Sequence, residues 1–486
     1  MGLGLNGGGL EAARYLASHG AQVTVTDLRD ETVLRPSIEA LGDLPIRFVL
    51  GKHEMSDFKN ADVVVKNPAV KPDSPFLAAA KRIETDISIF LQENPARLCA
   101  VTGSKGKSST ASALHWALSS LRNTTASHEK PLLPGRAYLG GNITVSPLTF
   151  LDQLRPEDDV VLELSSWQLG DLRGRKLIPA GTNGSQAAER ALLKPQVAIL
   201  TTILPDHLDR YGTMEAYVAD KRVLYQGQDS SDVTVTGSDS WGRSFAAETK
   251  GRPRIYQTWL SGQEAQDRRE GHRGEPKAEL DGWIDGSQGP CFARLADGSI
   301  AKVVPEAPLV PGIHQKQNLL ACALGLLDLG IPPELVREAL GSFPGIEHRL
   351  EFFYENRGIR FYNDTAATIP EAAAAAVQAF DQRPILVTGG TDKNLDFTPL
   401  AEACRKTKQV ILLAGTGTEK LKQLLDARGI SYLGPFDNLD RAVLAAIGKA
   451  QPGDKVVLSP GCASFGMFLN EFDRGRKWKE AIRRLA

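Results

Sequence analysis

Residues 98–110 read Leu98-Cys-Ala-Val-Thr-Gly-Ser-Lys-Gly-Lys-Ser-Ser-Thr110, an apolar run followed by a glycine-rich loop. The apolar run predicts a buried strand, and the residues from Lys107 onward predict a helix. In such a loop, glycines let backbone amides close around phosphate, Lys107 can reach outer phosphates, and Ser108 can ligate Mg²⁺. Because position 101 is Val, only the shorter Gly-x-x-Gly-Lys-Ser pattern is present, and a purely structural glycine turn is the alternative. The predicted ATP-binding residues of the loop are Gly103, Ser104, Lys105, Gly106, Lys107, Ser108 and Ser109.

Strand-like and helix-like segments alternate on both sides of this loop. Residues 10–19 predict a helix, and strands are predicted at residues 21–27, 46–50, 62–65, 160–164 and 197–200. Further strands are predicted at residues 359–362, 385–388, 410–414 and 456–458. This alternation is typical of α/β proteins with mainly parallel sheets.

The length of the chain predicts three domains, since domains average roughly 150 residues and the chain has 486. We place them at residues 1–93, 94–343 and 344–486. We expect Rossmann-like N-terminal and C-terminal domains, the latter doubly wound, and a central P-loop ATPase-like domain. Gly, Gln, Asp and Arg accumulate at residues 238–289, most densely at 263–277, which predicts an exposed insertion in the central domain.

Composition excludes several classes of protein. Lys and Arg total 57 and Asp and Glu total 58, so the net charge of −1 lacks the positive excess typical of nucleic-acid-binding proteins. The five cysteines are odd in number and form no Cys-x-x-Cys pair, so neither a disulfide framework nor a zinc site is predicted. The sequence contains no run of about 18 apolar residues and no signal peptide. We therefore expect a soluble, cytoplasmic protein that binds neither nucleic acid nor membrane.

A second glycine-rich loop, Gly2-Leu-Gly-Leu-Asn-Gly7, opens the sequence. It fits Gly-x-Gly-x-x-Gly, and Asp27 follows at a distance where an acid could hold a ribose hydroxyl. Taken alone, the pattern suggests NAD, and an ordinary tight turn is the alternative. Such a loop should follow a strand, but only Met1 precedes it, so either the start of the sequence is truncated or the first strand is absent.

Two residues of the central region could hold a metal ion. Glu163 lies within the apolar run Val160-Val-Leu-Glu-Leu164, and a buried carboxylate is costly unless it is paired or bound to a cation. His207 follows the predicted strand at residues 197–200, at the sheet edge where ligands of open α/β proteins bind. These positions predict magnesium ligands, with a paired core acid and a structural histidine as the alternatives.

Polar residues follow three predicted strands near the C-terminus, at residues 363–368, 389–393 and 459–464. The carboxyl ends of parallel strands meet at one edge of a sheet, so we expect Lys393 and Ser464 to face one crevice. Turn chemistry would explain each segment singly. Arg349 could reach phosphate across the cleft or form a surface ion pair.

Together these segments resemble the Mur ligases of peptidoglycan synthesis over essentially the whole chain, and among them the members that add D-glutamate. The resemblance rests on residues 2–7, 102–110, 140–143, 163–169, 206–211, 221–222, 312–318, 348–351, 363–365, 389–393 and 458–464. It implies an ATP-dependent, ADP-forming ligase that joins D-glutamate to UDP-N-acetylmuramoyl-L-alanine through an acyl phosphate. It also implies ATP and two Mg²⁺ ions as cofactors, and we expect a monomer.

The resemblance assigns one ligand to each domain: the UDP moiety to the N-terminal, ATP to the central and D-glutamate to the C-terminal domain. The implied UDP-substrate contacts are Leu5, Asn6, Asp27, Arg29 and Asn142. Beyond the phosphate loop, the implied ATP contacts are Asn318, Arg349 and Asp364. The implied glutamate contacts are Thr368, Lys393 and Ser464.

The implied metal ligands are Ser108, Glu163, His207 and Lys221, and the implied catalytic residues are Lys107, His207 and Lys221. A free ammonium at Lys221 would repel nearby Mg²⁺. The family carries a lysine carbamate at this position, which is an anion that can ligate Mg²⁺. A solvated helical lysine beside Arg222 is the alternative.

Two positions depart from the family pattern. Gln315 stands where asparagine is usual but keeps an amide, whereas Ala366 stands where lysine is usual and has no charge. The glutamate contacts and turnover could therefore differ. The rival interpretations are another Mur or folylpolyglutamate-type ligase, a nucleotide-binding homologue that has lost catalysis, and an NAD dehydrogenase. The second phosphate loop argues against the dehydrogenase.

Overall fold

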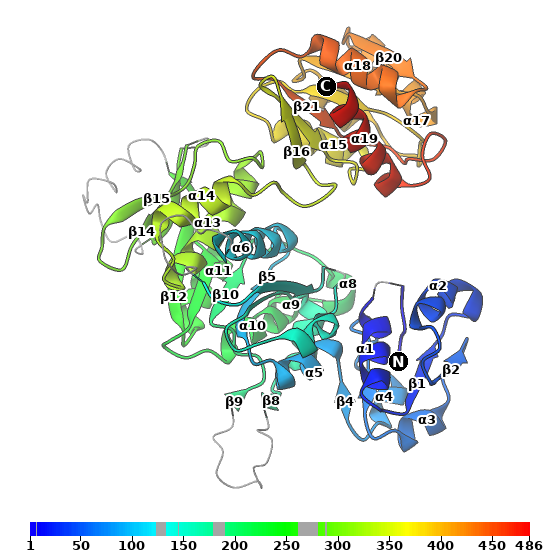
Figure 1. Cartoon of the computed structure of the whole chain (residues 1–486), viewed down its shortest axis with the longest axis vertical. Coiled ribbons are helices and arrows are strands. Elements are labelled where there is room, and N and C mark those ends of the chain that lie inside the picture. The colour runs from blue at the N-terminus through cyan, green and yellow to red at the C-terminus, as the bar shows by residue number, and fades with distance from the viewer. Residues whose placement is uncertain (6, 123–132, 144, 178–189, 261–279, 287–288) are drawn as a thin grey trace.

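A computed structural model describes residues 1–5, 7–122, 133–143, 145–177, 190–260, 280–286 and 289–486. The chain forms three lobes that follow one another along the sequence (Figure 1). Helices and strands alternate in each lobe, which confirms the predicted α/β class. Among the described residues, no helix is both long enough and apolar enough to cross a membrane.

The N-terminal lobe contains two small parallel sheets. β1 (Val23–Asp27) pairs with β2 (Ile46–Leu50), and β3 (Val64–Val65) pairs with β4 (Ile83–Glu84). Its helices are α1 (Gly8–Ser18), α2 (Glu31–Leu41), α3 (Met55–Asn60), α4 (Pro75–Ala78) and α5 (Asp86–Glu93). Residues 1–5 form no assigned strand, so the first glycine loop leads into α1 without one.

The central lobe is built on a sheet with the strand order β15-β14-β13-β12-β11-β10-β5-β7-β6. The strands from β13 to β6 run parallel, whereas β14 and β15 are antiparallel to their neighbours. Their bounds are β5 (Arg97–Thr102), β6 (Ala137–Gly141), β7 (Asp159–Glu163), β10 (Val197–Leu200), β11 (Val233–Gly237), β12 (Arg252–Leu260), β13 (Gly282–Asp285), β14 (Cys291–Arg294) and β15 (Ile300–Val304). A separate small hairpin pairs β8 (Lys176–Leu177) with β9 (Arg190–Ala191).

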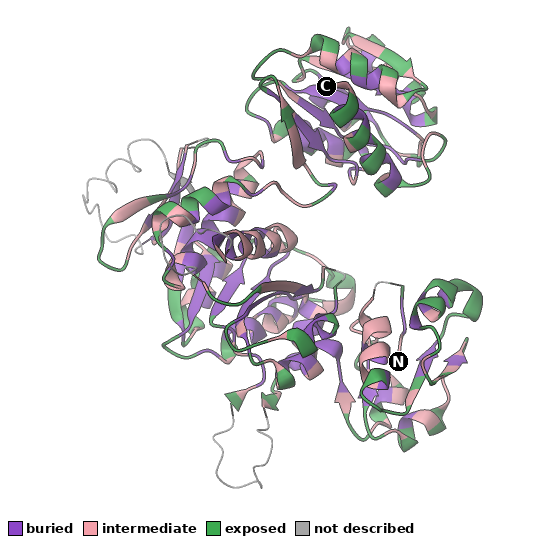
Figure 2. Cartoon of the chain, viewed as in Figure 1, coloured by how far each residue is buried: buried purple, intermediate pink, exposed green. Residues whose placement is uncertain are grey.

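Helices cover both faces of this sheet, and the core is concentrated in the sheets (Figure 2). One face packs against α6 (Lys107–Arg122), α13 (Ile313–Asp328) and α14 (Pro333–Gly341). The other packs against α7 (Ser166–Leu172), α9 (Met214–Lys221) and α10 (Val223–Gln226). The shorter elements are α8 (Leu208–Tyr211), α11 (Ser240–Glu248) and the 3₁₀ turns η1 (Pro147–Thr149) and η2 (Leu151–Gln153). Strands buried on both faces need apolar side chains, which is why residues 98–101 of β5, 160–162 of β7 and 197–200 of β10 are apolar.

The expectation of an exposed insertion at residues 238–289 is wrong for much of the described part of that range. It contains α11, β12 and β13, and the side chains of Phe245, Tyr256 and Trp283 are buried. The segment has few aliphatic residues, which led us to expect exposure, but its buried aromatic side chains form part of the core. The densest polar stretch, residues 263–277, lies outside the described residues.

The C-terminal lobe is built on a sheet with the order β16-β17-β21-β18-β19-β20, in which β16 is antiparallel to β17 and the other pairs are parallel. Its strands are β16 (Glu351–Asn356), β17 (Ile359–Asn363), β18 (Ile385–Thr388), β19 (Gln409–Leu413), β20 (Tyr432–Phe436) and β21 (Lys455–Leu458). Its helices are α15 (Pro370–Gln378), α16 (Thr398–Cys404), α17 (Thr416–Ala427), α18 (Leu439–Lys449) and α19 (Glu471–Leu485). Because β17, β21 and β18 are neighbours, the three polar segments that follow them lie at one sheet edge, as predicted.

Candidate active site

The second glycine loop connects β5 to α6. Gly103 and Gly106 adopt positive φ angles of 150° and 91°. A Cβ atom at Gly103 would lie 1.9 Å from Thr201 Oγ1, and one at Gly106 would lie 2.5 Å from Asn318 Oδ1. The loop therefore requires glycine at both positions, and it lies directly against Asn318, a predicted ATP contact.

Two lysines converge on one carbonyl of this loop. Lys107 Nζ donates to Gly103 O at 3.0 Å and to Ser104 O at 3.1 Å. Lys221 Nζ donates to the same Gly103 O at 2.8 Å. Within the described part of the chain, neither lysine forms an ion pair with a carboxylate. Burial lowers the pKa of Lys107, and a charged ammonium at Lys107 makes this loop attractive to an anion.

Lys221 is buried at the end of α9, with 1% of its surface exposed. Burial, followed by repulsion from Lys107, lowers the pKa of Lys221 to about 7. Its Nζ also lies 4.5 Å from the centroid of the Tyr217 ring. A large fraction of Lys221 is therefore an uncharged amine near neutral pH.

Glu163 ends β7 and is 1% exposed. Its Oε1 accepts a hydrogen bond of 2.8 Å from Asn142 Nδ2, whereas its Oε2 has no partner in the structure. An unpartnered buried carboxylate oxygen is costly unless a donor or cation reaches it. Carboxylate oxygen is also the ligand that Mg²⁺ prefers, so Glu163 fits the predicted role of a magnesium ligand.

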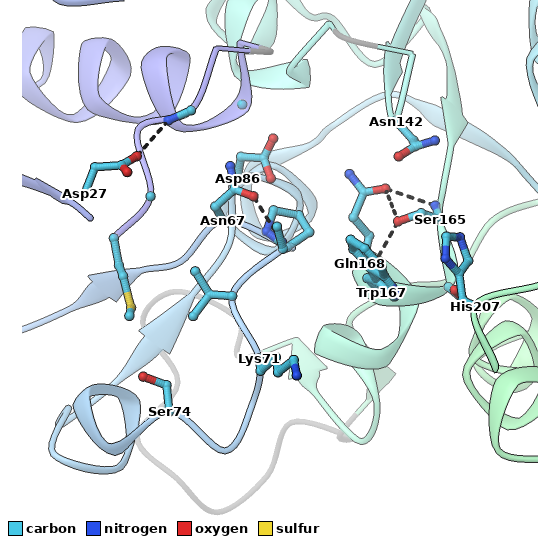
Figure 3. A pocket seen from close by; sticks show the side chains of 18 of the residues that line it. Asp27, Asn67, Lys71, Ser74, Asp86, Asn142, Ser165, Trp167, Gln168 and His207 are labelled. Carbon is cyan, nitrogen blue, oxygen red and sulfur yellow. Dashed lines mark hydrogen bonds between the residues drawn. The ribbon is translucent and has the colours of Figure 1, made fainter. Parts of the chain in front are cut away.

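His207 lies beside Trp167, with 5.1 Å between the ring centroids (Figure 3). The guanidinium of Arg210 lies 4.2 Å from the centroid of the same Trp167 ring. Ser165 begins α7 with a capping box, in which its Oγ accepts from Gln168 N and Gln168 Oε1 accepts from Ser165 N. We did not predict Trp167 as a site residue, although it stands between Ser165 and Gln168 in the motif that contains Glu163.

One cavity of about 1170 Å³ joins the two glycine loops. On the N-terminal side it is lined by Gly4, Leu5, Asp27 and Arg29, and on the central side by Lys107, Asn142, Trp167, His207 and Lys221. Lys107, His207 and Lys221 thus share one space with predicted UDP contacts, whereas Ser108 and Glu163 are not among its lining residues. Asn6, also predicted there, lies outside the described residues.

Asp27 is buried and already satisfied by protein donors. Its Oδ2 accepts from Gly4 N at 3.2 Å, and Arg29 forms an ion pair with it at 3.0 Å. Burial alone would raise the pKa of Asp27, but the hydrogen bonds from Arg29 and Gly4 outweigh it and hold the pKa below its ordinary value. Asp27 therefore fixes both Arg29 and the first glycine loop.

Asp364 follows β17 in the C-terminal lobe and is buried. Its Oδ2 accepts from Ser459 Oγ at 2.6 Å and its Oδ1 accepts from Leu350 N at 3.1 Å. Burial raises its pKa to about 7, and the nearby charge of Arg349 opposes this shift only weakly. The carboxyl group of Asp364 therefore has hydrogen-bond partners within its own lobe.

The predicted glutamate contacts lie in the same lobe. Ser464 is buried, Thr368 is half-buried and Lys393 is exposed, and a bridge between Thr391 and Ala463 joins the loops of the last two. The cavity between the glycine loops is lined only by residues up to Lys221. The structure thus gathers several of the predicted UDP, phosphate and metal residues around one cavity but does not bring the predicted glutamate contacts to them.

Arg474 is a residue of this region that we did not predict. It is 1% exposed and donates from Nε to Thr365 Oγ1 at 3.0 Å, from Nη2 to Thr365 O at 3.0 Å and from Nη1 to Cys462 O at 3.2 Å. It therefore connects the segment after β17 to the segment after β21. No motif in the sequence marks it, because Thr365, which accepts two of its three hydrogen bonds, lies 109 residues away.

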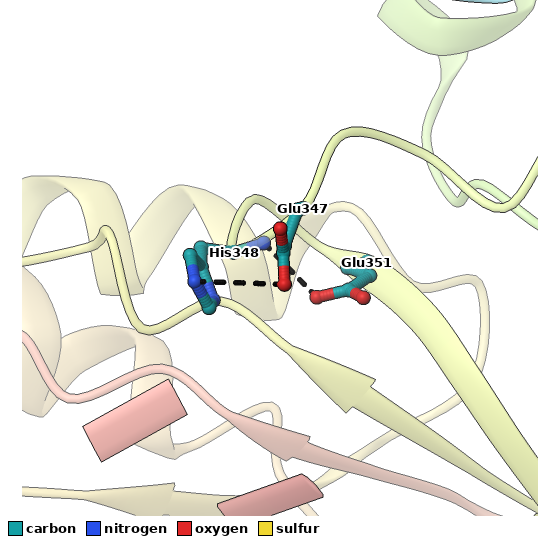
Figure 4. Close-up of side chains that lie close together, drawn as sticks. All are labelled: Glu347, His348 and Glu351. Carbon is teal, nitrogen blue, oxygen red and sulfur yellow. Dashed lines mark hydrogen bonds and ion pairs between the residues drawn. The ribbon is translucent and has the colours of Figure 1, made fainter. Parts of the chain in front are cut away.

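Glu347, His348 and Glu351 also lie close together (Figure 4), with potential ligand atoms within 4.8 Å of one another. However, Lys479 Nζ donates to Glu347 Oε1 at 2.8 Å and to Glu351 Oε1 at 2.9 Å. The ammonium of Lys479 already supplies the positive charge between the two carboxylates. The cluster is therefore explained as an ion-pair network at the start of the C-terminal lobe.

Three family models match the chain: the Mur ligase MurD-like N-terminal domain at residues 1–89, the Mur ligase middle domain at residues 101–324, and the Mur ligase glutamate ligase domain at residues 348–462. The UDP-N-acetylmuramoylalanine–D-glutamate ligase of Treponema pallidum is 40% identical over 99% of this chain and 96% of its own. The ligase of the same name from Roseiflexus sp. is 40% identical over 100% of this chain and 97% of its own.

Solved structures agree with this assignment at the level of the fold. The UDP-N-acetylmuramate-alanine ligase MurC of Thermotoga maritima matches with a TM-score of 0.53 at 19% identity, over 100% of this chain and 98% of its own. MurF of Acinetobacter baumannii matches with a TM-score of 0.53 at 16% identity, over 96% and 92%. The chain therefore belongs to the Mur ligase family.

Proposed function

We propose that this protein is an ATP-dependent, ADP-forming ligase that joins D-glutamate to UDP-N-acetylmuramoyl-L-alanine during cytoplasmic synthesis of peptidoglycan precursors. The observation that carries the proposal is the single cavity that extends from the first glycine loop to Lys107 and Lys221. It can place a uridine diphosphate at one end and the reacting carboxylate beside the phosphates of ATP at the other. The names of relatives 40% identical over nearly the full length support the same substrates.

In this proposal the ligands are distributed over the three predicted domains, residues 1–93, 94–343 and 344–486. In this proposal Leu5, Asn6, Asp27, Arg29 and Asn142 hold the UDP substrate. Residues 103–109 hold the phosphates of ATP, and Asn318, Arg349 and Asp364 hold its adenine, a phosphate and the ribose. Thr368, Lys393 and Ser464 hold D-glutamate. Since every proposed contact belongs to one chain, a monomer suffices.

Magnesium ions would be held by Glu163, His207, Ser108 and Lys221. The unpartnered Oε2 of buried Glu163 supports this role, because a bound cation would supply the partner that this oxygen lacks. Two bound ions would neutralise the phosphate charge that develops during phosphoryl transfer. In this arrangement Asn142 keeps the Glu163 side chain in position through its hydrogen bond to Oε1.

Lys221 would act as a carbamate. Its amine is buried, forms no ion pair with the described carboxylates, and has its pKa lowered to about 7. A neutral amine attacks CO₂ to form a nitrogen–carbon bond, and the proton that the nitrogen loses passes to solvent. The resulting anion replaces a cation that would repel Mg²⁺.

The reaction needs activation because a carboxylate is a poor electrophile. The carboxylate of UDP-N-acetylmuramoyl-L-alanine attacks the γ-phosphorus of ATP, the bond to the β-phosphate oxygen breaks, and ADP leaves. Lys107 neutralises charge at the transferred group. The amine of D-glutamate then attacks the acyl phosphate, loses a proton to solvent and displaces phosphate to leave an amide. The residues around the cavity mainly position the reactants and neutralise charge.

Phosphate release from ATP, measured with UDP-N-acetylmuramoyl-L-alanine in the presence and absence of D-glutamate, tests this proposal. We expect release that requires both substrates and matches the amide formed. Ala366 motivates one alternative, a homologue that binds nucleotide without turnover. Nucleotide binding without any release in the presence of both substrates would favour that alternative and contradict the proposed ligase. Release with another amino acid but not with D-glutamate would favour a different Mur or folylpolyglutamate-type ligase.

A further inference from the structure

The turn that precedes β16 carries Arg349 on an unusual backbone. His348 and Leu350, on either side of Arg349, adopt left-handed φ angles of 69° and 42°. Residues with a Cβ atom adopt this conformation at a cost, so it persists where surrounding contacts enforce it. Arg349 itself is exposed, and among the described residues its guanidinium has no hydrogen-bond or ion-pair partner. The turn therefore holds a free cation at the surface of the C-terminal lobe.

Glu351, the first residue of β16, closes this turn. Its Oε2 accepts a hydrogen bond from His348 N at 3.0 Å and another from Asn363 Nδ2 at 3.0 Å. Asn363 is buried at the end of β17, and its Nδ2 also donates to His348 Nδ1 at 2.9 Å. One carboxylate oxygen thus fixes both the backbone of His348 and the amide that orients the His348 ring.

The other carboxylate oxygen of Glu351 is held by α19. Lys479 Nζ donates to Glu351 Oε1 at 2.9 Å and to Glu347 Oε1 at 2.8 Å, and Figure 4 shows both carboxylates beside His348. The side chains of Lys479 and Glu351 are 14% and 13% exposed, whereas that of Glu347 is 63% exposed. Solvent and salt screen a shielded ion pair less than an exposed one. Lys479 therefore acts mainly on Glu351.

Two further hydrogen bonds join the turn to the segment that follows β17. Leu350 N donates to Asp364 Oδ1 at 3.1 Å, and Ala366 N donates to His348 O at 3.0 Å. Asp364 is the residue that we propose to hold the ribose of ATP. The residues on both sides of Arg349 are thus tied to the segment that contains Asp364. A nucleotide would meet these two side chains at a spacing that the turn sets.

We propose that Glu351 is a positioning residue for ATP, because it holds residues 348–350 in the conformation from which Arg349 binds a phosphate while Asp364 binds the ribose. This inference rests on the ATP contacts of the proposed function. Glu351 acts through the turn and does not touch the nucleotide. Without its carboxylate, His348 could relax to a less costly φ, and Arg349 would have to be ordered again when ATP binds.

The test is a double-mutant cycle in the full-length protein. Calorimetry measures the affinity for a non-hydrolysable ATP analogue with Mg²⁺ in the parent, Arg349→Ala, Glu351→Ala and the double variant. Glu351→Gln, which keeps one oxygen acceptor, is the conservative variant. Glu355→Ala is the matched control, because Glu355 lies on the same strand, is exposed and pairs with Arg360. Calorimetry also gives the stoichiometry, so an unfolded fraction lowers the stoichiometry and not the measured affinity.

We expect Arg349→Ala to weaken binding about tenfold or more, because a hydrogen bond between charged groups is lost. Glu351→Ala should weaken it about threefold or more in the parent and should have no further effect in the Arg349→Ala background, since the two residues act as a unit. Glu351→Gln should lose less affinity than Glu351→Ala, and Glu355→Ala should bind as the parent does.

Equal losses from Glu351→Ala in both backgrounds would overturn the proposal, because they would show that Glu351 does not act through Arg349. Affinity like that of the parent in either Arg349→Ala or Glu351→Ala would overturn it as well. Binding of the analogue requires neither UDP-N-acetylmuramoyl-L-alanine nor D-glutamate. Failure of this cycle and absence of ligase activity are therefore separate results.

Discussion

The central and C-terminal lobes satisfy their buried charges in different ways. In the central lobe, Glu163 keeps one carboxylate oxygen without a partner, and Lys107 and Lys221 share the carbonyl of Gly103. A bound cation would supply a partner for Glu163, and a bound anion would supply one for Lys107. The central lobe is therefore organised around charges that its own residues do not neutralise.

In the C-terminal lobe, the buried charged groups are satisfied from within. Asp364 accepts from Ser459 and Leu350, and its raised pKa reduces its charge near neutrality. Arg474 donates to three protein acceptors on Thr365 and Cys462. Substitutions in the central lobe should therefore act mainly on ligand binding and catalysis, whereas those in the C-terminal lobe should also act on stability.

The largest effect is expected for Lys107→Ala. The substitution removes a cation from the phosphate loop, and loss of such charge stabilisation commonly costs about 100-fold or more in turnover. Phosphate release is the measurement, and circular dichroism should show an unchanged fold. Lys250→Ala is the control, because Lys250 is an exposed lysine of the central lobe outside the phosphate loop. Turnover of Lys107→Ala within a factor of about three of Lys250→Ala would contradict the assigned role.

Lys221→Ala should also be nearly inactive, for a different reason. If Lys221 acts as a carbamate, the substitution removes an anion, and formate or acetate added to the assay should restore part of the activity. The same carboxylates should not rescue Lys107→Ala, which lacks a cation. A fully active Lys221→Ala protein, or equal rescue of both variants, would contradict the carbamate.

The sequence predicts those features of this molecule that depend on neighbouring residues. The strands β5, β7 and β10 are buried on both faces, so their apolar character is visible directly. The strand β16 was not predicted, because its residues are mostly half-exposed and mix charged with aromatic side chains. The burial of Tyr256 and Trp283 was concealed by polar neighbours, and it depends on where β12 and β13 pair in the sheet.

The same distinction applies to the candidate site. The phosphate loop could be predicted because its glycines, Lys107 and Ser108 are contiguous. Arg474 could not, since its partner Thr365 lies 109 residues away and an arginine in a helix is ordinarily solvated. Nor could the sequence predict that Lys107 and Lys221 meet at one carbonyl, because that contact depends on how close the end of α9 lies to the loop after β5.

Asp364→Asn should alter the pH dependence of stability. The folded protein raises the Asp364 pKa from 3.8 to about 7, so it binds more protons than the unfolded chain between these values. The contribution of Asp364 to the free energy of unfolding is therefore complete below about pH 4 and is lost as the pH rises through about 7. Asparagine mimics the protonated acid at every pH. Relative to the parent, the Tm of the variant should rise by about 2 °C or more between about pH 5 and pH 8. A constant difference would show that Asp364 is ionised throughout.

The smallest effect is expected for Ala366→Lys. Ala366 is half-buried beside Thr365, and its N–H donates to His348 O at 3.0 Å, so a longer side chain can extend toward solvent without breaking that bond. If the predicted glutamate contacts Thr368, Lys393 and Ser464 form the binding crevice, an added ammonium should lower the KM for D-glutamate a few-fold through attraction to its carboxylates. Ala366→Met, similar in length but uncharged, separates charge from bulk. A lower KM for the lysine variant alone would indicate a crevice short of positive charge. An unchanged or higher KM for both variants would indicate that the crevice is already complete without a charge at this position, in keeping with a lobe whose buried charges are satisfied from within.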